Sequence, residues 1–327
     1  MREGCSWAVG VAGPVRRAGP SARALGLRPA PGRDPAPAAV PRSCCALRCR
    51  CERLACAVRL RDGGVAVREL FVREAGAWIR WLQLNPAAGD AGPARVYVHG
   101  LGCSAASDYA EVATTPPLAG RVGLLVDLFG HGYSDRPVDF GYRMREQADA
   151  VAAVIEHVGL RDVELIGHSM GGAVAIELAA ARPDLIAKLV VAEPNLFPGG
   201  GFVSSVIASQ EEQAFVAEGF ARMVAGEKLP DYVARLRLAD ALALHRSATA
   251  LVEGTSPSWG AMLTELSQPR AFVVGERTRP DAETDLMAAA GVPVVDVPDA
   301  THNMMIDNPG GFAEAVDLAL SAAEPGV

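Results

Sequence analysis

The sequence predicts an α/β protein with a mainly parallel β-sheet that helices cover on both faces. Short apolar runs alternate with longer stretches whose apolar residues recur at helical spacing, a pattern typical of parallel sheets. The alternation stops between Leu196 and Gln268, where amphipathic segments follow one another without a strand. A serine flanked by glycines stands between one apolar run and the helix that follows it. We therefore expect an α/β core, interrupted by one helical insertion, that carries a catalytic serine.

The first part of the predicted core covers residues 65–195. Two short amphipathic runs at 70–76 and 77–84 are joined tightly, which predicts an antiparallel hairpin. Compact apolar runs that end in glycine or polar residues predict buried strands, and stretches of helical spacing predict helices between them. The remaining strands are expected within 95–100, 122–132, 163–168 and 188–195, with helices at 145–160 and from 170 to 182.

The predicted helical insertion covers residues 196–268. Residues 202–226 and 232–254 each read as one long amphipathic helix. The alternation resumes in the second part of the core, 269–327, with strands within 270–276 and 292–302 and a helix near 282–290. A last helix is expected to begin at Pro309 with Asn308 as its N-cap, because proline is favoured at the first helical position.

The first 64 residues have a composition of their own and are expected to form a disordered leader. Residues 1–60 hold 11 Arg and three acidic residues (Glu3, Asp34 and Glu52), seven Pro and six of the seven Cys, with no apolar periodicity. Such a segment cannot bury enough apolar surface to offset the entropy cost of ordering it. The cysteine run at 44–56 matches no common zinc spacing and has no histidine, so we expect no metal site.

Composition and charge exclude two further classes of function. The net charge of −7 argues against nucleic-acid binding. No apolar run approaches the roughly 18 residues that a membrane span requires. The sequence therefore predicts a cytoplasmic protein with neither a nucleic-acid nor a membrane partner, and it leaves the oligomeric state open.

The disordered-leader interpretation predicts that the segment is dispensable. A protein that begins at Val65 should fold with an unchanged melting temperature and keep its activity, because residues 1–64 contribute no packed surface. Thermal unfolding of the full and shortened chains checks this. A melting temperature lowered by more than a few degrees would instead mean that the leader packs on the core.

The motif GHSMGG at 167–172 predicts a nucleophile. It follows an apolar strand and opens a helix, which is the context that a G-x-S-x-G nucleophile elbow requires. Ser169 would sit on a strained turn that the glycines at 167 and 171 leave room for, and the helix N-terminus favours negative charge nearby. We expect Ser169 to be the catalytic nucleophile and His168 to line the elbow.

The motif HGLG at 99–102 follows another predicted strand. In such a sheet the loop after this strand supplies one backbone N–H to an oxyanion hole, and the residue after the nucleophile supplies the other. These donors are predicted to be the N–H groups of Leu101 and Met170. His99 and His131 are expected to be structural, and His157 and His245, on predicted helices, to face solvent.

His302 is the predicted general base, because it follows the last strand and comes after the nucleophile and the candidate acids in sequence. The acid that orients it is harder to assign. Thr278, which cannot ionise, occupies the position after residues 270–276 where a carboxylate is expected. We favour Glu193, which directly follows the apolar run of 188–192. Its rivals are Asp281, which also reads as a helix N-cap, and Glu276 and Asp299.

Together these motifs resemble those of the α/β-hydrolase family. The segments HGLG, DLFGHGYSD, GHSMGG and PDATHNMMIDNP stand in the family's order and at about its spacings, and the resemblance runs from about residue 70 to the C-terminus. It implies an eight-stranded sheet, a helical cap formed by residues 196–268, and hydrolysis through an acyl-serine intermediate without a cofactor. Some members of the family place their acid after the strand that Glu193 follows. The departure is Thr278, where many members have aspartate.

The predicted cap is rich in apolar side chains, some of which are expected to wall the active site. The best substrate prediction is therefore a small-to-medium apolar carboxylic ester, with lactone, thioester, amide and carbon–carbon bond hydrolysis as alternatives. A non-catalytic or weakly catalytic ligand-binding protein of this fold is a further alternative. The candidate wall residues are Phe202, Val206, Ile207, Phe215, Phe220, Met223, Trp259 and Met262.

Overall fold

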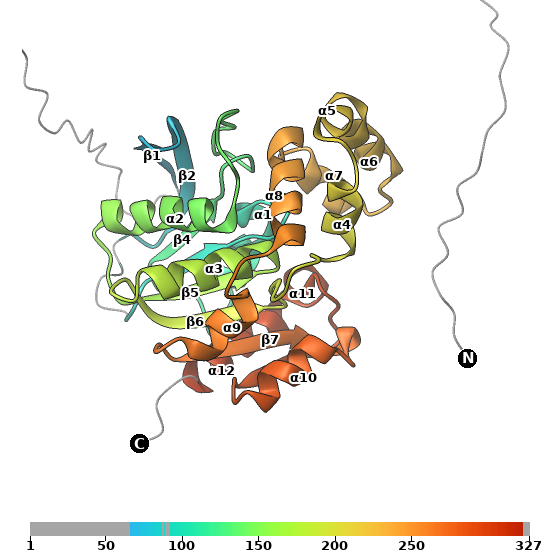
Figure 1. Ribbon diagram of the computed structural model, residues 1–327. Coiled ribbons are helices and arrows are strands. Elements are labelled where there is room, and N and C mark those ends of the chain that lie inside the picture. Colours follow the sequence, from blue (N-terminus) through green and yellow to red (C-terminus); the bar gives the residue numbers. More distant parts are fainter. Residues whose placement is uncertain (1–65, 87, 89–91, 323–327) are drawn as a thin grey trace, which may run out of the picture. The chain divides into compact units, whose positions relative to one another are not determined.

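The computed structural model describes residues 66–86, 88 and 92–322 (Figure 1). The predicted leader at 1–64 lies outside these residues. The described part contains one eight-stranded sheet with the order β1-β2-β4-β3-β5-β6-β7-β8. Its strands are β1 (Ala66–Val72), β2 (Ala77–Leu84), β3 (Arg95–Val98), β4 (Gly123–Asp127), β5 (Val163–His168), β6 (Ile186–Ala192), β7 (Arg270–Gly275) and β8 (Val294–Val297).

The sheet is parallel from β4 to β8, and β2 joins it through antiparallel pairs with β1 and β4. The predicted hairpin is therefore confirmed, as is the mainly parallel eight-stranded sheet. Because β3, β5, β6, β7 and β8 run parallel, their carboxyl ends lie at one edge. The loops that carry the predicted site residues follow these strands.

Helices cover both faces of the sheet (Figure 1). One apolar core lies under α2 (Met144–Val158), α3 (Met170–Ala181), α9 (Trp259–Glu265) and α10 (Ala282–Ala289). A second core on the opposite face lies under α1 (Ala105–Thr114), α11 (Met304–Asp307) and α12 (Pro309–Ala322). The predicted start of the last helix is confirmed, since α12 begins at Pro309 and the Asn308 side chain accepts the N–H of Gly311 at 2.9 Å.

The insertion between β6 and β7 is helical, but the expectation of two long helices is wrong. It contains α4 (Phe202–Ala208), α5 (Glu212–Ala214), a π-helical turn (Phe215–Gly219), α6 (Phe220–Gly226), α7 (Pro230–Leu236), α8 (Ala241–Glu253) and α9. Side chains of Ser209 and Gln210 bond to the carbonyl of Val206, which competes with helix continuation. Asp240 caps a new helix by accepting the N–H of Ala243 at 3.0 Å.

The histidines on predicted helices behave differently from one another. His157 is exposed, as expected, but His245 is only 7% exposed, so its predicted solvation is wrong. Its Nε2 lies 2.7 Å from the carbonyl oxygen of Gln210, and its ring lies beside Phe215. The neighbouring segments of the insertion cover this face of α8, which periodicity within one helix does not predict.

Within the described residues, no helix has both the length and the apolar character needed to cross a bilayer.

Candidate active site

Ser169 lies on the sharp turn between β5 and α3. Its backbone has φ 53° and ψ −122°, and a positive φ is strained for a residue with a Cβ. The flanking glycines are required by close approach: a Cβ on Gly167 would lie 2.4 Å from the carbonyl oxygen of Gly171, and one on Gly171 would lie 2.3 Å from that of Val98. The elbow therefore has the strand–turn–helix geometry predicted for it.

Glu193 and His302 meet at the carboxyl edge of the sheet. Glu193 follows β6, also at a positive φ of 38°, and its Oε2 lies 2.7 Å from Nδ1 of His302. Its other oxygen, Oε1, accepts the N–H of Gly275 at the end of β7, at 2.9 Å. The Glu193 side chain is 9% exposed, whereas that of His302 is 47% exposed. The hydrogen bonds with Gly275 and His302 thus fix the position of the Glu193 carboxylate, and the carboxylate in turn holds the Nδ1 edge of the imidazole.

The other carboxylates considered from the sequence have different partners. Asp281 accepts the N–H of Thr284 at 2.8 Å and caps α10. Glu276 accepts the N–H of Asp299 at 3.0 Å, and Asp299 pairs with Arg277 at 2.9 Å. Within the described residues, none of the three forms a hydrogen bond with His302.

The predicted oxyanion donors come from two separate segments of the chain. Met170 is the first residue of α3, and Leu101 lies in the loop between β3 and α1. In the part of the chain that the structure describes, neither backbone N–H has a hydrogen-bond acceptor. Both donors are therefore free to bind a ligand oxygen. Ser169 and His302 line one pocket, and within the described residues no hydrogen bond joins their side chains.

Two buried histidines brace the Leu101 loop. Nε2 of His131 accepts the N–H of Gly102 at 3.3 Å, and Nε2 of His99 accepts that of Leu128 at 3.1 Å. Burial lowers the pKa of His99 to about 4 and that of His131 to about 3, so both rings are neutral acceptors near neutral pH. This geometry is consistent with the structural roles expected for them.

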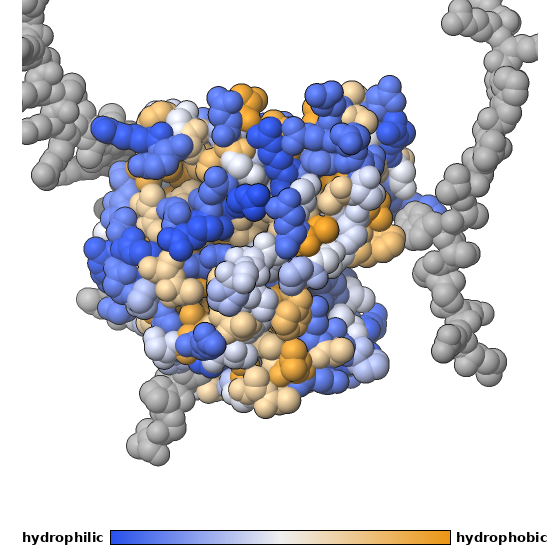
Figure 2. Space-filling model, viewed as in Figure 1, coloured by the Kyte–Doolittle hydropathy of each residue, from blue (hydrophilic) through white to orange (hydrophobic). Residues whose placement is uncertain are grey.

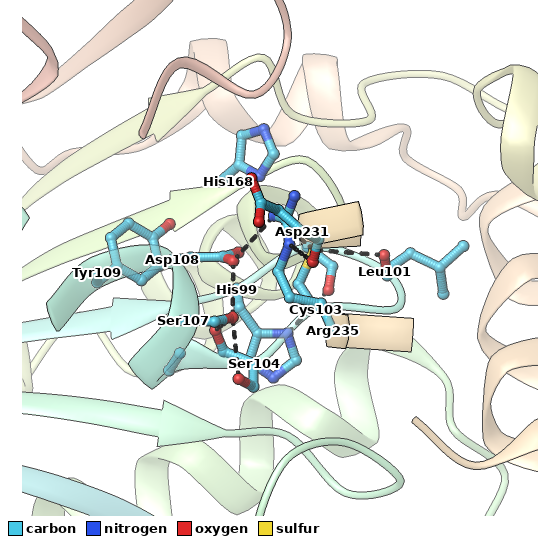
Figure 3. Close-up of polar contacts among 12 residues, drawn as sticks. His99, Leu101, Cys103, Ser104, Ser107, Asp108, Tyr109, His168, Asp231 and Arg235 are labelled. Atoms are coloured by element: carbon cyan, nitrogen blue, oxygen red, sulfur yellow. Dashed lines mark hydrogen bonds and ion pairs between the residues drawn. The ribbon is translucent and has the colours of Figure 1, made fainter. Parts of the chain in front are cut away.

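A buried ion pair joins the insertion to the same loop region (Figure 3). Arg235 on α7 is 5% exposed, and its Nη1 lies 3.2 Å from Oδ1 of Asp108 on α1 and 3.8 Å from Sγ of Cys103. Neither Arg235 nor Asp108 was singled out from the sequence. The two residues lie 127 positions apart in the chain and become neighbours only in the folded protein.

The site opens into a pocket of about 550 Å³. Its apolar lining includes Leu101, Phe197, Phe202, Val203, Leu229, Tyr232, Leu251 and Phe272. Of the wall residues predicted from the sequence, Phe202 lines this pocket, whereas the Trp259 side chain is buried and donates to Glu177 Oε1 at 3.0 Å. Around the insertion the surface also carries apolar residues, and Figure 2 shows orange and tan residues among polar ones near α4. Phe202 is 76% exposed there.

The aspartate and glutamate side chains in the described pocket lining have no lysine or arginine counterpart there. Besides Glu193, the lining includes Glu227, Asp281 and Glu283, and no lysine or arginine is among the described lining residues. Burial raises the pKa of Glu283, and the nearby Asp281 carboxylate adds to this effect. The pocket is therefore apolar with an acidic bias.

Comparison with known proteins agrees with this geometry. The family model described as alpha/beta hydrolase fold matches residues 95–253, which include β3 to β6, the nucleophile elbow and most of the insertion. The chain has the α/β-hydrolase fold.

Relatives of this hydrolase include esterases and lipases. The sn-1-specific diacylglycerol lipase ABHD11 of Mus musculus is 29% identical over 73% of this chain and 85% of its own length. Lipase LipV of Mycobacterium tuberculosis is 42% identical, but that match spans only 25% of this chain and 30% of the lipase. The solved esterase of Exiguobacterium antarcticum superposes with a TM-score of 0.64 at 18% identity, covering 77% of this chain and 98% of the esterase. At the level of the family, the prediction of a hydrolase is confirmed.

Proposed function

We propose that this protein is a serine hydrolase that cleaves a small-to-medium, uncharged apolar carboxylic ester through an acyl-serine intermediate. The observation that carries the proposal is the 2.7 Å contact between Glu193 and His302, made beside a serine on a strained elbow in the same pocket. An orienting carboxylate, an imidazole and a hydroxyl in one pocket have the composition of a catalytic triad. Glu193 takes the role for which Thr278 is unsuited.

In the proposed acylation step, Ser169 Oγ attacks the carbonyl carbon of the ester while His302 accepts the hydroxyl proton. Glu193 stabilises the imidazolium that forms, through the Nδ1–H bond. The N–H groups of Leu101 and Met170 donate to the oxyanion of the tetrahedral intermediate. Collapse of this intermediate breaks the bond to the leaving alcohol, which takes the proton from His302, and leaves the acyl group on Ser169.

In the proposed deacylation step, His302 removes a proton from a water molecule that attacks the acyl-serine. Collapse of the second intermediate releases the carboxylic acid and returns the proton to Ser169. The side chains and backbone donors named here suffice for both steps.

A fluorophosphonate probe tests the proposed nucleophile directly. The intact protein should be labelled stoichiometrically at Ser169, because an activated serine attacks the probe's phosphorus. Mass spectrometry of the labelled peptide identifies the position. A folded protein that neither reacts with the probe nor hydrolyses any ester would instead favour a ligand-binding role for this pocket.

The pocket's charge predicts which esters are preferred. For p-nitrophenyl esters of equal length, a neutral acyl chain should be hydrolysed with at least about tenfold higher kcat/KM than one ending in a carboxylate, a difference of about 1.4 kcal/mol. The described lining contains carboxylates and neither lysine nor arginine. It should therefore repel an acyl chain that ends in a carboxylate. Added salt should reduce the ratio, because screening weakens this repulsion. An anionic ester preferred at low salt would contradict the prediction.

A further inference from the structure

His168 is a buried imidazole that takes no part in the proton transfers proposed above. It precedes the nucleophile, is 2% exposed, and lines the pocket. Its Nε2 lies 2.9 Å from the backbone carbonyl oxygen of His302. Because a carbonyl oxygen only accepts, Nε2 carries the proton and donates it, which leaves Nδ1 unprotonated. Figure 3 draws this ring together with Leu101 and Cys103, from the loop after β3, and with Arg235.

The His168 ring fills the space between two loops of the site. On one side its centroid lies 4.6 Å from that of the His302 ring, at an interplanar angle of 46°. On the other side it packs on Gly100, where an added Cβ would lie 3.1 Å from Nδ1 of His168 and 3.3 Å from Cβ of Ser169. Nδ1 has no hydrogen-bond partner within the described residues. One side chain thus contacts the oxyanion loop and the loop that carries the proposed base.

His302 needs such support. Its side chain is 47% exposed and lies on a loop beyond β8, and Glu193 holds only Nδ1. A catalytic group must stay within a few tenths of an ångström of its working position for efficient transfer. The bond from His168 fixes the backbone of His302, while the ring contact restricts its side chain.

His168 is also suited to a neighbour that becomes charged during the reaction. Burial lowers its pKa well below the ordinary value for histidine, and the nearby His302 lowers it further. The ring therefore stays neutral and adds no positive charge beside the imidazolium. A lysine or arginine at this position would repel that charge.

We propose that His168 is a positioning residue that holds His302 in its catalytic orientation through the Nε2–H bond to the His302 carbonyl and through ring packing. This inference rests on the proposed function. It assigns the residue before the nucleophile a role in aligning the base, in addition to lining the elbow.

Three variants separate the hydrogen bond from the ring. His168→Phe keeps an aromatic ring and removes the donor, and it should lower kcat about tenfold or more with KM changed less than about twofold. His168→Gln places an amide N–H near the position of Nε2 and should recover much of this loss. His168→Asn is polar but too short to reach the carbonyl, so its kcat should resemble that of the Phe variant. If the Phe variant fails to fold, the comparison of Gln with Asn decides.

His245 offers a matched control. It is 7% exposed, and its Nε2 also lies against a backbone carbonyl, at 2.7 Å from Gln210. Its Nδ1 also has no hydrogen-bond partner among the described residues, although Oε2 of Glu212 lies 4.0 Å away. It lies on α8 outside the described lining of the catalytic pocket. His245→Phe should lower the melting temperature and leave kcat unchanged.

Two results would overturn the inference: wild-type kcat in folded His168→Phe, or equal kcat in the Gln and Asn variants. Labelling of the wild-type protein by fluorophosphonate keeps these failures distinct from failure of the proposed function. If wild-type protein is labelled and active while all His168 variants match it, only the positioning role is wrong. If wild-type protein is neither labelled nor active, the proposed hydrolase function is wrong, and the inference falls with it.

Discussion

Ser169→Ala should reduce ester hydrolysis by roughly a thousandfold or more, because removal of a triad nucleophile leaves only binding and oxyanion stabilisation. The substitution keeps a Cβ at the strained φ of 53°, so it changes the reactive oxygen and not the backbone requirement of the elbow. Turnover of a p-nitrophenyl ester measures the loss, and circular dichroism establishes that the variant is folded.

Fluorophosphonate labelling provides a second readout of the same variant, since no adduct should form. Ser247→Ala is the matched control, because Ser247 is fully buried in α8, outside the described pocket lining, and its hydroxyl has no partner among the described residues. It should keep both turnover and labelling. Near-wild-type turnover in a folded Ser169→Ala protein would rule out Ser169 as the nucleophile.

Glu193→Gln should lower turnover by about a thousandfold or more while the fold is kept, since the imidazolium loses its orienting charge. The amide can still accept the N–H of Gly275, but its other end no longer provides a carboxylate for Nδ1 of His302. Steady-state kinetics should show the loss mainly in kcat, because Glu193 acts on the transition state through His302.

Two further variants test whether this effect is specific. Glu177→Gln changes another buried glutamate, one that accepts the Trp259 indole N–H, and should leave kcat unaffected. Asp281→Asn should cost at most about 2 kcal/mol of stability through a weakened helix cap and retain most turnover. If Asp281→Asn lost turnover and Glu193→Gln did not, the acid that orients His302 would have to be assigned to the loop after β7.

Several features of this protein follow from local sequence. The glycines around Ser169 predict the elbow because Gly167 and Gly171 approach each other within five consecutive residues, although Gly171 also lies against the distant Val98. Asn308 and Pro309 predict the start of α12 because capping acts over one helical turn. Alternating apolar runs predict the parallel sheet because each strand between two helical layers is apolar on both faces.

Other features are contacts between distant segments. The long amphipathic stretches at 202–226 and 232–254 suggest continuous helices, yet the polar side chains of Ser209, Gln210 and Asp240 end or begin helices within or beside them. His245 reads as a solvated helix residue, but packing of the insertion buries it. The apolar periodicity of a segment gives no information on which other segments cover its polar face.

The same distinction applies to the candidate site. The sequence by itself determined the elbow around Ser169, the order of the motifs and the set of carboxylates that could serve His302. Only the tertiary structure decided which of these carboxylates lies against His302, because Glu193 is 109 residues away and reaches it through the register of β6, β7 and β8. The contact of His168 with the same loop has the same origin. The register of the parallel strands brings their carboxyl ends together, and short-range sequence patterns do not encode this register.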